Sequence, residues 1–113
     1  MSRRPIIRGI RPGTDEVILD LEIPGDLDYF TGHFPDIAIL PGVVQLHWAI
    51  ELGQEYLSLP GAFAGMEVVK FQEIIRPGSR VELELRFDAD KGKLYFSYSS
   101  SGGRHASGRI LLR

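Results

Sequence analysis

The chain has 113 residues, of which 43% are hydrophobic and 25% are charged, and its length and composition predict one globular domain, residues 1–113, with a single core. The formal net charge of −2 argues against general nucleic-acid binding. The absence of cysteine excludes disulfides, thiolate catalysis and cysteine-ligated zinc.

The N-terminus combines arginines with no apolar segment behind them, so we expect no signal peptide. The longest apolar stretch, residues 37–44, contains a proline and is too short to cross a bilayer. We therefore expect a cytoplasmic protein without a membrane span. We interpret the first arginines as a solvated arm, with a local basic patch as the alternative. These arginines are Arg3, Arg4, Arg8 and Arg11.

The first half of the chain predicts a strand, a long connection and a helix. Residues 15–23 (DEVILDLEI) alternate in part, which favours a strand. Residues 26–40 form a connection of a length that is often functional in compact domains. Residues 41–57 predict a helix, with Pro41 at its first position. This helix is apolar on nearly every side, so we expect it to be buried all round.

The second half predicts a sheet. Its strands are expected at residues 63–75, 81–87, 94–99 and 104–112. The seven alternating positions of VELELRF, 81–87, give the clearest strand signal. Strands joined by short turns pair antiparallel. One buried helix with several such strands predicts an α+β fold in which the sheet wraps around the helix.

The start of the predicted helix is chemically unusual. The side chain of Leu40, at the expected cap position, has no oxygen to accept hydrogen bonds from the first free N–H groups. The amides of Gly42, Val43 and Val44 therefore need another acceptor. Such a helix end is a suitable site for an oxyanion or a polarised carbonyl. The alternative is that a loop carbonyl or a water molecule accepts these hydrogen bonds.

Two histidines flank this helix start. His33 lies beside Phe34 in the preceding loop, nine positions before Gly42, and His47 lies within the helix. Glu51 follows His47 at i+4, where it can keep the imidazole protonated or fix its tautomer. Together these groups would form an acid–base site. The alternatives are a structural His33 and a buried, neutral His47.

Other chemistry has little support in the sequence. The three histidines lack metal-ligand spacing, and no HExxH, GxSxG or phosphate-loop motif occurs, so we expect neither a metal nor a cofactor. Tyr95, Phe96 and Tyr98 could suggest an aromatic nucleic-acid platform. At strand spacing they fit a sheet core better, so no nucleic-acid partner is expected.

Several segments resemble one enzyme family. The segments GHFP (32–35) and ILPGV (39–43) resemble the signature of 3-hydroxyacyl-acyl-carrier-protein dehydratases of the FabA/FabZ type. The segments VKF (69–71) and RPG (76–78) resemble a strand and turn of that family. The stretch QLHWA (45–49) is most similar to the ApeI-like branch, which belongs to aryl-polyene and related polyketide-type pigment clusters.

The resemblance implies a hot-dog fold, an antiparallel sheet wrapped around one long helix. It implies dehydration of a 3-hydroxyacyl thioester to the trans-2-enoyl thioester in fatty acid or aryl-polyene/polyketide-type biosynthesis. The substrate would be carried on the phosphopantetheine of acyl carrier protein. The resemblance also implies a homodimer or a larger assembly, with a related subunit as a further option, and active sites at the subunit interface.

The resemblance also assigns roles to individual residues. His33 takes the place of the catalytic histidine, and the N–H of Gly42 would hold the thioester carbonyl. The family's acidic residue falls at His47, so His47 and Glu51 would have to supply the acid. The expected site consists of catalytic His33, His47 and Glu51 and of substrate-binding Gly42, Val43 and Phe34.

The histidine at position 47 leaves two alternatives open. A hot-dog thioesterase would use the same helix end, with a water nucleophile activated by His47 or Glu51. A non-catalytic partner subunit would bind acyl chains or stabilise an active homologue. In each case Arg76 and Arg80, with the N-terminal arginines, are candidates for docking an acidic carrier protein.

Overall fold

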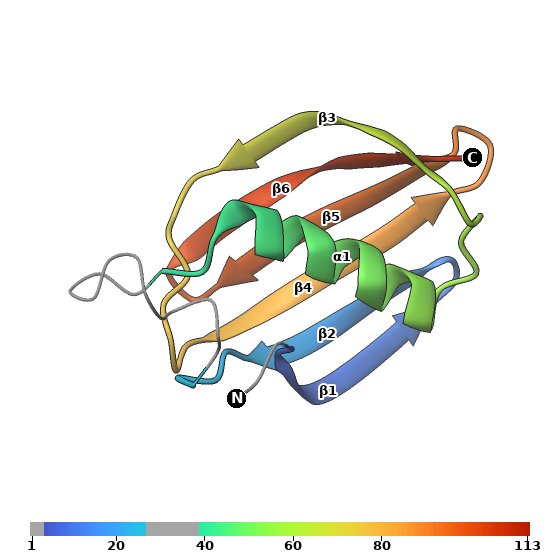
Figure 1. The fold of residues 1–113 in the computed structure, drawn as a ribbon. Coiled ribbons are helices and arrows are strands. Elements are labelled where there is room, and N and C mark those ends of the chain that lie inside the picture. Colours follow the sequence, from blue (N-terminus) through green and yellow to red (C-terminus); the bar gives the residue numbers. More distant parts are fainter. Residues whose placement is uncertain (1–3, 27–38) are drawn as a thin grey trace.

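The computed structural model describes residues 4–26 and 39–113, which form one helix and a six-stranded sheet (Figure 1). Neighbouring strands pair antiparallel in the order β1-β2-β4-β5-β6-β3, and α1 lies across one face of the sheet (Figure 1). The elements are β1 (Ile6–Gly13), β2 (Glu16–Glu22), α1 (Gly42–Tyr56), β3 (Phe63–Phe71), β4 (Arg80–Asp88), β5 (Lys93–Ser100) and β6 (Gly103–Leu112). This confirms the predicted α+β architecture.

Alternation along the central strands separates the core from solvent. Leu19 on β2 lies opposite Leu83 on β4, and both side chains are fully buried under α1. The next pair, Asp20 and Glu82, faces the other side of the sheet. Because side chains of a strand alternate between faces, this register places one apolar face toward the helix.

The helix supplies the other half of the core. Trp48, Ala49 and Leu52 are almost completely buried against the sheet. From β5, the hydroxyl of Tyr98 donates a hydrogen bond of 2.6 Å to the backbone carbonyl of Gln45. Burial raises the pKa of Tyr98, so its hydroxyl stays a neutral donor. These contacts fix the position and rotation of α1 on the sheet.

The helix is exposed along one side, so the expectation of burial all round is wrong. The bounds 41–57 agree with α1 within one residue at each end, but Pro41 is the N-cap rather than the first helical residue. Val43 is 73% exposed and the His47 side chain is 64% exposed. The sheet covers only one side of α1, which leaves an apolar side chain and an imidazole on the other.

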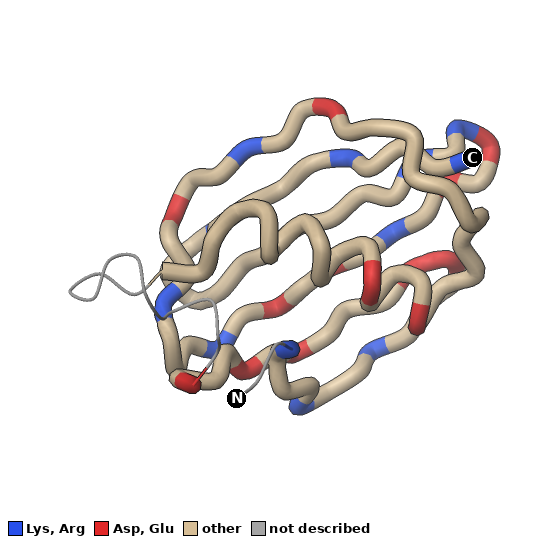
Figure 2. Tube along the Cα trace, in the orientation of Figure 1, with Lys and Arg blue, Asp and Glu red and all other residues tan. Residues whose placement is uncertain are grey.

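Residues Ile6–Gly13 form the edge strand β1, so Arg8 and Arg11 do not lie in the predicted solvated arm, and Arg3 lies outside the described residues. On β1, Arg8 lies 2.8 Å from Glu22, and Arg11 contacts both Asp20 (3.0 Å) and Glu82 (2.5 Å). Basic positions of β1 thus lie beside acidic positions of β2 and β4 (Figure 2). Arg11 offsets two carboxylates that lie opposite each other. The run IIRGIRPG hides this strand because its arginines, glycines and proline weaken the alternation.

No helix in residues 4–26 and 39–113 has the length and hydrophobicity needed to cross a bilayer.

Candidate active site

The amide end of α1 has no side-chain cap. Pro41 stands at the N-cap without an acceptor atom in its side chain. Within the described part of the chain, no acceptor is paired with the N–H of Gly42 or Val43. The N–H of Val44 is not free, contrary to the prediction, because it bonds to the Pro41 carbonyl at 3.1 Å. Among the described residues these two adjacent amides have no acceptor, and they lie at the positive end of the helix dipole, which favours an oxygen atom as ligand.

A cavity of about 350 Å³ opens at this helix end, between the start of α1 and the residues at the end of β3. Gly42 and Phe71 both line it. A Cβ atom added at Gly42 would lie 2.7 Å from Cζ of Phe71, so the aromatic ring approaches the backbone closely. A larger residue at position 42 would force the Phe71 ring or the helix end to shift. A larger hollow of about 610 Å³, lined by residues such as Asp20 and Glu82, contains none of the predicted site residues.

Gln45 fixes the approach to the helix and was not predicted as a site residue. It is 4% exposed and lines the same cavity. Its Nε2 donates to the carbonyl of Leu40 at 3.2 Å, while its Oε1 has no hydrogen-bond partner among the residues described. A glutamine within an apolar helical run was the available signal, because buried amides are usually retained for their hydrogen bonds.

The third histidine holds the opposite wall of the cavity. Nδ1 of His105 lies 3.1 Å from the carbonyl of Ile74, and its Nε2 lies 2.7 Å from Oγ of Ser100. The N–H of Gln72 donates to the His105 carbonyl at 2.8 Å. The tautomer with hydrogen on Nδ1 satisfies both ring contacts, since Ser100 can then donate to Nε2. His105 therefore has a structural role in positioning the segment after β3.

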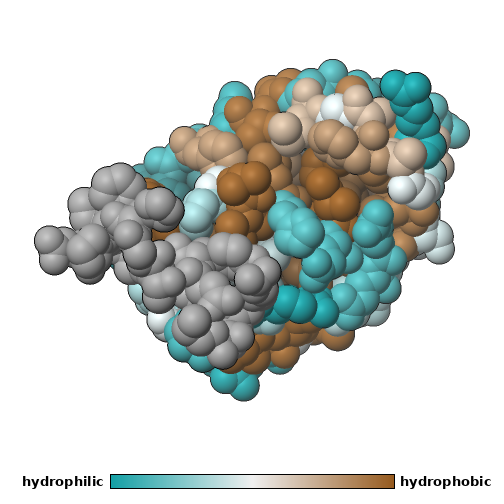
Figure 3. Space-filling model, viewed as in Figure 1, coloured by the Kyte–Doolittle hydropathy of each residue, from teal (hydrophilic) through white to brown (hydrophobic). Residues whose placement is uncertain are grey.

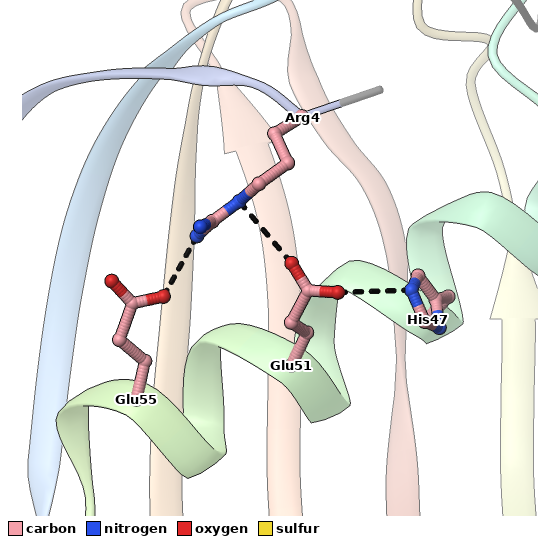
Figure 4. A network of polar contacts seen from close by, with 4 residues as sticks. All are labelled: Arg4, His47, Glu51 and Glu55. Atoms are coloured by element: carbon pink, nitrogen blue, oxygen red, sulfur yellow. Dashed lines mark hydrogen bonds and ion pairs between the residues drawn. The ribbon is translucent and has the colours of Figure 1, made fainter. Parts of the chain in front are cut away.

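His47 belongs to a polar network on the exposed side of α1 (Figure 4). Its Nε2 lies 3.0 Å from Oε2 of Glu51, as the i+4 spacing predicted. Arg4, from the segment before β1, lies 3.2 Å from Oε1 of Glu51 and 2.7 Å from Oε2 of Glu55. The hydrogen bond to Glu55 is the largest cause that raises the pKa of the Arg4 guanidinium.

The structure does not bring all predicted site residues together. Gly42 lines the cavity, whereas neither Val43 nor His47 does. Both of these side chains face outward from α1. His33 and Phe34 lie outside the described residues. Within one chain, the described part of the site therefore consists of two separate halves, an amide end beside a cavity and an exposed imidazole–carboxylate pair.

The arginines considered for carrier docking are mostly paired. Arg80 lies 3.4 Å from Glu22, and the arginines of β1 contact acidic side chains of β2 and β4. Arg76 has no ion pair with the described carboxylates and is exposed. Carrier docking thus stays a prediction that depends mainly on Arg76.

Comparison with known proteins identifies the family. The model of the ApeI-like family, described as ApeI dehydratase, matches residues 10–109. The 3-hydroxyacyl-acyl-carrier-protein dehydratase FabZ of Erythrobacter litoralis is 35% identical over 77 residues, which cover 60% of this chain and 51% of the relative. FabZ of Roseiflexus sp. is 40% identical over 67 residues, covering 53% of this chain and 47% of the relative. The chain therefore spans about half the length of the curated relatives it matches.

Solved structures resemble the whole fold. The dehydratase heterocomplex ApeI:P from Xenorhabdus doucetiae contains a chain that matches with a TM-score of 0.89 and 33% identity, over 96% of both chains. An uncharacterised protein from Erwinia carotovora matches with a TM-score of 0.82 and 32% identity, over 96% of this chain and 94% of that chain. These matches confirm the predicted hot-dog fold, and with the family match over residues 10–109 they show that the chain belongs to the ApeI-like dehydratase family.

Proposed function

We propose that the protein removes water from 3-hydroxyacyl thioesters carried by acyl carrier protein and releases trans-2-enoyl thioesters, in cytoplasmic fatty acid or aryl-polyene/polyketide-type biosynthesis. The observation that carries this proposal is the uncapped amide end of α1, at Gly42 and Val43, beside a cavity in a chain of a dehydratase family. Backbone N–H groups at a helix N-terminus stabilise negative charge that develops on a carbonyl oxygen.

In the proposed reaction, the α-hydrogen and the β-hydroxyl group are eliminated together as water. The N–H of Gly42 polarises the thioester carbonyl, which makes the α-hydrogen more acidic. Neutral His33 takes this proton, and the electron pair of the C–H bond forms the carbon–carbon double bond. The bond between the β-carbon and the hydroxyl oxygen breaks as protonated His47 gives its proton to that oxygen, which leaves as water. His33 ends protonated and His47 neutral, and exchange with solvent restores both.

The separation of His47 from the cavity supports a site shared between two subunits. His47 is exposed and does not line the cavity beside its own Gly42. In the proposed assembly, a second copy or a related subunit lies against this face, and each His47 serves the cavity of the other subunit. The solved relative described as a heterocomplex, ApeI:P, favours a related subunit as one form of this assembly.

The edge strand β3 offers a surface for such an assembly. It pairs with β6 on one side only, and its ladder shifts between Glu67 and Lys70, where Val68 has a φ of 54°. Apolar side chains gather on the face seen in Figure 3. Four exposed ones belong to β3: Phe63, Met66, Val68 and Phe71. An open strand edge with exposed apolar side chains favours pairing with another chain.

A partner subunit without activity of its own is the second candidate function. Two observations favour this candidate. His47 stands at the position of the family's acid, and the solved relative ApeI:P is described as a heterocomplex. Mass spectrometry of a carrier protein loaded with a 3-hydroxyacyl group separates the candidates. Dehydration predicts loss of one water with the acyl group still attached. Loss of the whole acyl group would indicate a thioesterase, and an unchanged mass despite binding would indicate a partner subunit.

A further inference from the structure

We infer that Arg4 is a positioning residue, which holds the Glu51 carboxylate so that His47 presents Nδ1 to the substrate. This inference rests on the proposed function of His47 as the acid. Arg4 precedes β1 and lies outside residues 10–109, the part of the chain that the family model matches.

The contacts of Arg4 match the shape of its guanidinium group. Its Nε lies 3.2 Å from Oε1 of Glu51, and its Nη2 lies 2.7 Å from Oε2 of Glu55 (Figure 4). The two glutamates stand one turn apart on α1, so a planar group with several fixed donors can reach both. A lysine, with one flexible ammonium, cannot reproduce both contacts in the same geometry.

Holding one oxygen of Glu51 directs the other. With Oε1 bound by Arg4, Oε2 lies 3.0 Å from Nε2 of His47. Nε2 must carry a hydrogen to donate to this carboxylate. In neutral His47 the proton is therefore on Nε2 and Nδ1 is unprotonated. In protonated His47, the Nδ1–H is the donor left for the departing hydroxyl.

The charged groups beside His47 sum to a negative value. Glu51 and Glu55 carry two negative charges and Arg4 one positive charge, which leaves one net negative charge beside the imidazole. Glu55 thus offsets the repulsion that Arg4 alone would exert on an imidazolium. Tyr56 is a further titratable group that acts on Arg4. Coverage of this face by a second subunit would exclude water and strengthen each interaction.

An exposed ion pair that merely fastened the N-terminal segment to α1 would affect stability slightly and catalysis not at all. A positioning role for Arg4 predicts changes in kcat and in the tautomer of His47, whereas a purely structural role predicts neither change. The test therefore uses Arg4→Gln, Glu51→Gln and the double variant, with a 3-hydroxyacyl-pantetheine thioester as substrate. Arg109→Gln is the matched control, because Arg109 lies 3.3 Å from Glu67, in a different ion pair.

We expect Arg4→Gln to lower kcat about tenfold with KM nearly unchanged. Arg109→Gln should leave kcat unchanged. In the Glu51→Gln background, Arg4→Gln should cause no further loss, because Arg4 acts through Glu51. Independent, additive losses or an unchanged kcat in Arg4→Gln would overturn the inference.

Nitrogen NMR of His47 gives a readout that needs no substrate. The neutral imidazole should carry its hydrogen on Nε2 in the wild-type protein and should become a mixture of tautomers in Arg4→Gln. The same single tautomer in both proteins would overturn the inference. A wild-type protein that fails to dehydrate the thioester would contradict the proposed function and with it the positioning role of Arg4. An active wild type with an unaffected Arg4→Gln would contradict this inference alone.

Discussion

Nε2 of His47 lies 3.0 Å from Oε2 of Glu51 on the exposed side of α1, so the two residues form one imidazole–carboxylate unit. The family signature that the sequence resembles has a single acidic residue at the position of His47. A carboxylic acid and an imidazolium can both protonate a leaving hydroxyl, and a carboxylate at hydrogen-bond distance orients the imidazole ring and selects its tautomer. The proposed proton donor is therefore the His47–Glu51 pair rather than a single side chain.

Removing either member of this pair should impair the proton transfer. We expect His47→Gln to lower kcat for a 3-hydroxyacyl thioester about a hundredfold, because general acid catalysis typically contributes that much or more. Glu51→Gln should lower kcat by at least about tenfold, since it leaves the imidazole in place without its partner. Steady-state kinetics measures both. Gln54→Ala, an exposed change on the same helix, is the control; wild-type kcat in His47→Gln would exclude His47 as the acid.

A side chain at position 42 should disturb the amide end of α1. In Gly42→Ala the new Cβ would lie within 2.7–3.0 Å of three atoms of the Phe71 ring, so the ring or the helix end must move. We expect kcat/KM to fall about a hundredfold, because the amide that holds the carbonyl is displaced or blocked. Gly61→Ala is the matched control, since an added Cβ there meets no atom within 4 Å. Equal kcat/KM values in the two variants would exclude the Gly42 amide as the carbonyl donor.

The edge strand β3 should mediate assembly. Met66 is 49% exposed on β3, and Ile10 is 48% exposed on β1, the strand at the opposite edge of the sheet. Met66→Lys should shift light-scattering mass toward the monomer and lower activity, because a charge at an open edge opposes pairing with another chain. Ile10→Lys should change neither property. The opposite pattern would place the interface on β1.

Stability should depend on pH through Glu67. Lys93 lies 2.6 Å from Oε1 of Glu67, and this hydrogen bond is the largest cause that lowers the pKa of the carboxyl below its ordinary value of 4.5. A lowered pKa in the folded state means that the unfolded chain takes up the proton first as pH falls. The stabilisation is therefore complete above pH 4.5 and is lost as pH falls toward the folded-state pKa.

Thermal unfolding between neutral pH and pH 3 tests this expectation. The Tm difference between the wild-type protein and Glu67→Gln should shrink as the pH falls. Glu84→Gln is the control, because Glu84 lies on the exposed face of β4 and forms no ion pair with the described residues. A Tm difference for Glu67→Gln that does not change with pH would show that Lys93 does not favour the ionised carboxylate.

Local patterns in the sequence were sufficient to predict most of the strands and the helix. The alternation in 81–87 predicts β4, and the position of Pro41 predicts the start of α1 within one residue. The pairing of β3 with β6 was not predictable, because two strands intervene in the chain and local patterns carry no information on that contact. The exposed side of α1 was missed for a related reason. The apolar composition of the helix predicts burial on all sides, but Val43 and His47 lie on the side of α1 that faces away from the sheet.

The candidate site was predictable to the extent that its chemistry is local. The lack of a side-chain oxygen at Leu40 and Pro41 indicates a helix end without a side-chain cap, and i+4 spacing indicates the contact of His47 with Glu51. The part played by Arg4 could not be read from the sequence, because it meets Glu55 from 51 positions away. Only the fold brings the two together.

The proposed dehydration requires that His33 remove the α-hydrogen while the amide end of α1 stabilises the negative charge that develops on the thioester carbonyl. Continuous absorbance of the enoyl thioester, formed from a 3-hydroxyacyl-pantetheine thioester, measures this for the wild-type protein and for His33→Ala. We predict that the wild-type protein forms the enoyl product and that His33→Ala loses most of this rate. Equal enoyl formation by both proteins, or release of free acid and thiol by the wild type, would contradict the dehydratase mechanism.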